Sequence, residues 1–143
     1  MFLDRMRLFF LEDSPFFEEI GMAINFLGET PGSFSINSVP VNPIVKKYVD
    51  GGSLRQYMFT ITYRDFYDCE DFTANVTIAS FEFLTEWIDE ANKKNILPKL
   101  DNGFVPVSLE VVSTAQQKNH KAARAVYEIK CRLLYEKKGD LNL

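Results

Sequence analysis

The chain has 143 residues, of which 46% are hydrophobic and 25% charged, as in an ordinary globular protein. These proportions argue against a disordered or membrane-embedded chain, and the length predicts a single domain over residues 1–143. The formal net charge of −4 argues against non-specific binding to nucleic-acid phosphates. Thirteen phenylalanines and six tyrosines favour a β-containing core or a large aromatic contact surface.

The first quarter of the chain predicts a short helix followed by strands. Within residues 2–11, apolar side chains recur at helical spacing: Phe2, Met6, Phe9 and Phe10. Ser14-Pro15 interrupts this helix, and a second short turn or helix is expected from Phe16. The apolar run 22–27 fits either the end of a helix or an edge strand, and we favour a strand from Ala23. After a turn at 28–32, the alternating residues 33–39 predict another strand.

The strongest fold signal is a hairpin. Two β-rich runs, 43–49 and 54–64, flank the glycine-containing turn 50–53. Alternation in the second run predicts one buried face, made of Tyr57, Phe59, Ile61 and Tyr63. Pro40 and Pro43 cannot donate to a strand ladder, so we expect a bend, an edge or a bulge between the preceding strand and this hairpin.

An acidic connector, residues 65–71, leads into one long helix that is expected to end near Asn92. Its apolar stripe should lie on the sheet: Phe81, Leu84, Trp87, Ile88 and Ala91. Either Thr73 or Asn75 is the expected N-cap. We expect Asn95 to adopt the left-handed conformation that commonly follows the end of a helix.

The last third of the chain predicts two strands. A turn at 101–103 precedes alternating apolar residues expected to share one face: Val105, Val107, Leu109 and Val111. Residues 113–123 are polar and predict a loop, and residues 125–136 alternate as a final strand. The expected fold is therefore α+β, a largely antiparallel or mixed sheet with a long helix packed on one face and a short N-terminal helix.

No constellation of side chains in the sequence indicates catalysis, a cofactor or a metal. His120 is the single histidine, so one chain cannot assemble a multi-histidine metal site. The acidic connector lacks the loop of a calcium site, and whether it binds a cation stays open. Glu82, Glu86 and Glu90 are spaced by four and predict a solvated helix face. Two distant cysteines, Cys69 and Cys131, fit a reduced cytosolic setting.

Several stretches of the sequence resemble the tail terminator proteins, often labelled minor capsid proteins, of tailed phages and prophages of Gram-positive bacteria. The residues that carry the resemblance are 41–49, Gly51-Gly52 with 54–57, Trp87-Ile88 and 129–135, in the same order. Together they span most of the chain from Leu27 onward. The resemblance implies a structural virion protein of the tail assembly, neither an enzyme nor a carrier of a cofactor.

The same resemblance implies particular partners and a place in the virion. Such proteins form a homo-hexameric ring on the tail tube, end its polymerisation and provide the surface for head–tail joining. The implied partners are further copies of the chain, the tail tube protein and a head-completion or connector protein, with no membrane. Genomic DNA would pass through the lumen without specific binding. Assembly would occur in the bacterial cytoplasm, and the mature location would be the head–tail junction of the virion.

The candidate contact residues are charged or flexible where no core demands it. They are Lys46, Lys47, Asp50, Gly51, Gly52 and Arg55 in the hairpin, and Lys118, His120, Lys121 and Arg124 in the polar loop. We expect Arg55 to lie with Lys47 on the exposed side, so that replacing both with Glu leaves the monomer folded but impairs a ring.

Three other readings of the sequence stay open. One is a small-molecule-binding α+β domain with an aromatic pocket between Trp87 and the sheet, and with tyrosine hydroxyls as polar handles: Tyr57, Tyr63 or Tyr127. Another is a different head-to-tail connector component. The third is an accessory enzyme that uses a metal held by Asp65 and Asp68 or by the Glu82 and Glu86 pair.

Overall fold

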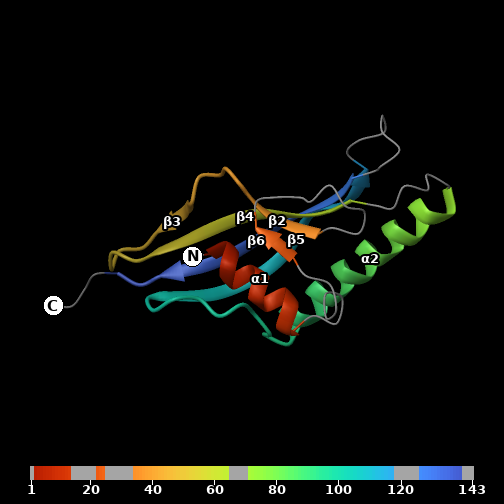
Figure 1. Cartoon of the computed structure of the whole chain (residues 1–143). Helices are drawn as coiled ribbons and strands as arrows, with labels where there is room; N and C mark the ends of the chain where they lie inside the picture. The colour runs from red at the N-terminus through yellow and green to blue at the C-terminus, as the bar shows by residue number, and fades with distance from the viewer. Residues whose placement is uncertain (1, 14–21, 25–33, 65–70, 118–125, 140–143) are drawn as a thin grey trace.

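The computed structural model describes residues 2–13, 22–24, 34–64, 71–117 and 126–139. The helices and strands follow one another as α1 (Phe2–Asp13), β1 (Met22–Ile24), β2 (Phe34–Val39), β3 (Ile44–Lys47), β4 (Ser53–Arg64), α2 (Asp71–Lys93), β5 (Phe104–Gln117) and β6 (Val126–Lys137). Both helices lie on one face of the sheet (Figure 1). The predicted α+β class is therefore confirmed. The segments predicted at residues 14–21, 25–33, 65–70 and 118–125 lie outside the described residues.

The six strands form one sheet with the order β1-β2-β4-β6-β5, and β3 pairs with β4 beside this path. Only β1 and β2 run parallel among the described pairs, so the sheet is largely antiparallel, as predicted. β2 pairs with residues 58–63 of β4 and β3 with residues 53–55. The chain thus follows one edge of β4 in two pieces, with the expected break at Pro40 and Pro43.

The core lies between the helices and one face of the sheet. Its largest fully buried side chains are Met6, Phe10, Ile36, Phe59, Ile61, Phe81, Leu84, Ile88, Leu109, Tyr127 and Ile129. The predicted inward face of β4 is confirmed, because Phe59 and Ile61 are fully buried and Tyr57 and Tyr63 pack against the core. The same alternation is confirmed in β6, where every second residue from Tyr127 to Tyr135 is buried.

Aromatic rings of α1 join the sheet to α2. The Phe2 ring centroid lies 4.8 Å from that of Tyr135, and Phe10 lies 6.1 Å from Phe59. The Phe9 ring of α1 contacts the other helix, with its centroid 5.6 Å from that of Trp87 in α2. Trp87 packs against the core, as predicted of the apolar stripe of α2, and its ring also contacts Phe9 and Phe10 of α1.

The first residue of α2 differs from the prediction, whereas the end of the helix agrees with it. The helix begins at Asp71, so the predicted caps Thr73 and Asn75 lie within it. At the other end, Asn95 adopts the predicted left-handed conformation with φ of 58°. The Ile96 N–H donates to the Ala91 carbonyl over 2.8 Å, the long-range bond of a Schellman motif.

β5 departs from the predicted alternation. Pro106 pairs with Tyr135 and Ser108 with Leu134, so Val107 is an extra residue, a β-bulge. The bulge reverses the facing of the residues before it, which leaves Val105 and Val107 more than 40% exposed, whereas Leu109 is buried. The predicted loop at 113–123 is also wrong in its first part, because β5 continues to Gln117.

The sheet face away from the helices is partly closed by a polar cluster. The Ser35 and Thr62 hydroxyl oxygens lie 2.6 Å apart, and the Asn37 amide donates to Thr62 over 3.1 Å. Thr60 and Thr62 lie on this face of β4, opposite the predicted buried face, and both are less than 10% exposed. Hydroxyl groups satisfy one another across the strands, which lets polar residues be buried there without unpaired donors.

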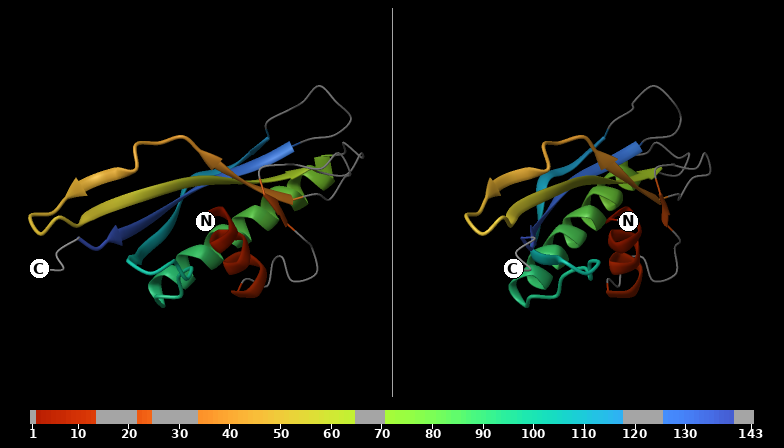
Figure 2. Two further views of the ribbon diagram at one scale, coloured as in Figure 1. Left: turned by 60° about the vertical axis from the view of Figure 1, so that its left-hand side comes forward. Right: turned by 90° about the vertical axis from the view of Figure 1, so that its left-hand side faces the viewer.

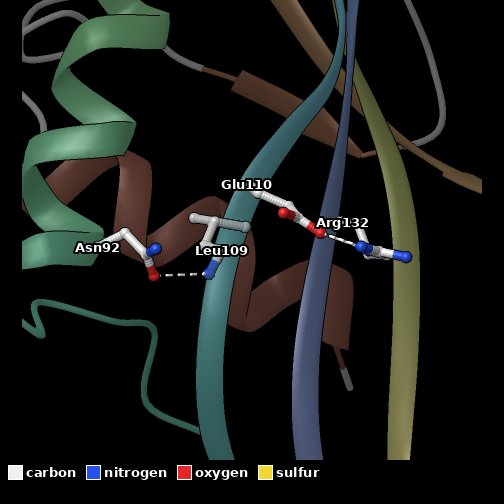
Figure 3. A network of polar contacts seen from close by, with 4 residues as sticks. All are labelled: Asn92, Leu109, Glu110 and Arg132. Atoms are coloured by element: carbon white, nitrogen blue, oxygen red, sulfur yellow. Dashed lines mark hydrogen bonds and ion pairs between the residues drawn. The ribbon is translucent and has the colours of Figure 1, made fainter. Parts of the chain in front are cut away.

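Two polar contacts attach β5 to α2 and to β6 (Figure 3). The Leu109 N–H donates to the Asn92 side-chain oxygen over 3.1 Å, which ties β5 to the last turn of α2. On the neighbouring residue, Glu110 accepts hydrogen bonds from the Arg132 guanidinium of β6. Within the described residues, neither helix has the length and apolar character needed to cross a bilayer.

Replacing Phe10 with Ala should lower the free energy of unfolding by about 3–5 kcal/mol, because it opens a cavity between the sheet and Trp87. Urea unfolding followed by circular dichroism measures this loss. Leu8→Ala is the matched control on the same helix, since Leu8 is 37% exposed, and it should cost less than about 1 kcal/mol. Equal losses of stability in the two variants would show that Phe10 does not contribute to the core between the helices and the sheet.

Candidate protein-contact site

The β3–β4 hairpin projects beyond the helices at one end of the sheet (Figure 1; Figure 2, left). We call residues 44–55 the hairpin arm. Its exposed side chains include Val45, Lys46, Lys47, Val49 and Asp50, and Val49 is fully exposed. Four of the predicted contact residues are thus exposed: Lys46, Lys47, Asp50 and Gly51.

The turn of the arm is held by its own hydrogen bonds. The Tyr48 N–H donates to the Gly52 carbonyl over 2.8 Å, and the Asp50 carboxylate accepts from the Gly52 N–H over 2.8 Å. Gly51 has φ of 90°, which glycine adopts without strain. Asp50 and Gly51 therefore shape the turn, whatever else the arm contacts.

Gly52 and Gly139 make a close contact between the turn and the residues that follow β6. A Cβ atom on Gly139 would lie 2.4 Å from the Asp50 carbonyl oxygen, so no other residue fits without a backbone shift. Gly52 was predicted as an exposed contact residue, but it is buried against the residues that follow β6. Gly139 had no signal in the local sequence, because its neighbour in space is almost ninety positions away.

Arg55 was predicted to lie on the exposed side with Lys47. It lies instead on the same face of β4 as Tyr57, two residues later. Its Nε donates to the Ser53 hydroxyl over 2.9 Å, and its side chain hydrogen-bonds Tyr135. Burial raises the pKa of Tyr135, and the hydrogen bond and positive charge of Arg55 partly oppose this shift. Arg55 is thus a structural residue at the base of the arm.

Strand register brings further lysines to the same end of the molecule. Ser53 pairs with Lys47 on one side and with Lys137 on the other, and both lysines are exposed. Lys46 and Lys138 are exposed beside them, together with the carboxylates of Asp50 and Glu136. The arm end of the molecule therefore carries an excess of positive charge, to which Lys137 of β6 and Lys138 just after it contribute, and neither was among the predicted contact residues. The other predicted contact residues lie outside the described residues: Lys118, His120, Lys121 and Arg124.

The groups considered for catalysis do not form a site in the part of the chain that the structure describes. No group of three or more His, Cys, Asp or Glu side chains there could hold a metal ion. Glu82, Glu86 and Glu90 are exposed on α2, as expected of a solvated face. Cys131 is fully buried, and burial raises the pKa of its thiol far above the ordinary value, so the unreactive protonated form dominates. Asp65 and Asp68 lie outside the described residues.

A ligand was proposed between Trp87 and the sheet, but the Phe10 ring lies there, with its centroid 6.1 Å from that of Phe59 and 6.5 Å from that of Trp87. Burial raises the pKa of Tyr57, whose hydroxyl hydrogen-bonds Ser38. A groove of about 140 Å³ lies elsewhere, lined by Arg5, Leu8, Phe9, Glu12, Asp13, Leu97 and Lys99. It is smaller than the roughly 300 Å³ of a typical ligand site, and none of the three candidate tyrosines lines it.

Compared with models of known protein families and with curated proteins, the chain matches none. Its function is therefore inferred from the resemblance of the sequence and from the surfaces of the molecule.

Replacing Arg55 with Ala should lower the free energy of unfolding by about 1–3 kcal/mol, because Tyr135 and Ser53 lose a charged partner. Lys47→Ala is the control from the same arm, and it should change stability by less than about 0.5 kcal/mol because Lys47 is exposed. Urea unfolding of both variants measures the difference. If Arg55→Ala were as stable as the wild type, Arg55 would return to the candidate contact residues.

Proposed function

We propose that this chain is a structural protein of a tailed phage or prophage, a tail terminator that assembles into a ring. The ring, a homo-hexamer, caps the tail tube, ends its polymerisation and offers the docking surface for the head. The protein is a minor capsid protein without catalytic activity, metal or cofactor.

The observation that carries this proposal is the hairpin arm. The stretches that resemble tail terminators, residues 41–49 and 54–57, build most of it. The arm extends the sheet past the helices and exposes Val45 and Val49, which add nothing to the core. Apolar side chains on a projecting, internally bonded element suit a contact between subunits, where their burial would contribute binding energy. We assign the long helix that the sequence predicts on the sheet to α2.

The proposed partners follow from the same role. They are other copies of the chain, the tail tube protein and a head-completion or connector protein, at the head–tail junction of the virion. Genomic DNA passes through the ring without specific binding, and the net charge of −4 favours this because it limits attraction to phosphates. Assembly takes place in the cytoplasm of the bacterial host.

Class averages from negative-stain electron microscopy of the purified protein should show a closed ring with six-fold symmetry. Adding the ring to polymerising tail tube subunits should give tubes that bear a cap at one end and stop growing, whereas tube subunits alone continue to elongate. Light scattering checks the mass of the ring in solution. Monomers or two-fold dimers, even with tail tube subunits present, would overturn the proposal.

A further inference from the structure

The outer surface of α2 carries a row of carboxylates around an exposed phenylalanine. We call it the acidic helix face, formed by Glu82, Phe83, Glu86, Asp89 and Glu90, all exposed. Phe83 is 55% exposed, and no lysine or arginine occurs between residues 81 and 92. The opposite side of the same helix segment holds Phe81, Leu84 and Ile88 in the core.

This surface adds little to the stability of the folded monomer. Glu90 forms an ion pair with Lys93 over 3.7 Å, but both side chains are at least 60% exposed, and such pairs add little stability. Four carboxylates on adjacent helical turns repel one another, and Phe83 contributes nothing to the core. One exposed apolar residue is ordinary, so its importance depends on whether another surface complements it.

The hairpin arm is that complementary surface. Its exposed apolar side chains, Val45 and Val49, match the exposed ring of Phe83. Its lysines, Lys46, Lys47 and the neighbouring Lys137, match the carboxylates of α2 in sign. The arm projects away from α2, so the two surfaces of one chain do not meet (Figure 1; Figure 2).

We propose that the hairpin arm of one copy docks on the acidic helix face of the next copy. Val45 and Val49 then cover Phe83, and the arm lysines lie against Glu82 and Glu86. Such a contact is heterologous, since each copy uses two different surfaces, and it generates a ring where the rotation closes or a filament where it does not. The inference rests on the proposed function for the closure of that ring, and it names the surfaces that meet.

The contact has a defined dependence on salt. Its charged groups are exposed in the monomer, so the attraction between arm and helix is screened once the Debye length falls to a few Å. Raising the salt concentration from about 0.05 M to about 1 M should therefore weaken self-association. A contact made only of apolar side chains would hold or strengthen under the same change.

A charge-swap series tests the proposal directly. The arm variant is Lys47→Glu with Lys137→Glu, the helix variant is Glu82→Lys with Glu86→Lys, and the swap variant carries all four changes. Control variants of equal net charge change residues away from both surfaces: Lys99→Glu with Lys130→Glu, and Glu12→Lys with Asp13→Lys. Sedimentation velocity over a concentration series measures self-association, electron microscopy reports closure, and circular dichroism checks folding.

The arm and helix variants should each weaken self-association at least about tenfold, because like charges then face each other across every contact. The swap variant should recover most of the loss, and both controls should associate like the wild type. Phe83→Ser should weaken association without any change of charge, which keeps the test open if a charged variant misfolds.

The other possible outcomes separate the docking proposal from the proposed function. If the wild type forms rings and the arm and helix variants assemble like the controls, or the swap variant fails to recover, the docking proposal is overturned and the terminator function stands. Open filaments that respond to the swap support the docking and overturn the ring. A wild type that stays monomeric at every concentration, with or without tail tube subunits, overturns both.

Discussion

The packing of α1 against both the sheet and α2 completes the hydrophobic core of the molecule. Phe10 meets Phe59 on the sheet, and Phe9 meets Trp87 on α2, so α1 completes the core beside the direct contact of α2 with β5. At its first turn, Phe2 lies on Tyr57 and Tyr135. The helical cover ends there, and the hairpin arm begins where it stops.

The uncovered end of the sheet is nevertheless well ordered by its backbone. β4 stays paired with β6 as far as Ser53, and Arg55 anchors the base of the arm through Tyr135 and Ser53. The turn closes on its own hydrogen bonds and on Gly139. A contact element that is already organised loses little conformational entropy when a partner binds, which favours the arm as an interface.

The net charge of −4 conceals a separation of charge that matters more than the sum. Positive side chains gather at the arm, where β6 adds Lys137 to those of β3, and negative ones gather on the outer side of α2. Two unlike surfaces on one subunit suit head-to-tail assembly, because one surface of each copy can bind the other surface of the next copy. The proposed role of a tail terminator requires such assembly, whereas the alternative aromatic ligand pocket would need space between Trp87 and the sheet, where Phe10 contacts both.

Features that depend on residues two to four positions apart could be predicted from the sequence. Alternation predicted β2, β4 and β6, helical spacing predicted α1 and the buried side of α2, and Asn95 predicted the helix end. It also placed the lysines of the arm, and the parity of Arg55 with Tyr57 could have shown that Arg55 faces inward. The folded chain was needed to reveal the bulge at Val107, the position of Lys137 and Gly139 beside the turn, and the contact of Trp87 with α1. Each of these depends on strands or helices that meet from distant parts of the chain, where spacing along the sequence carries no information about which residues become neighbours.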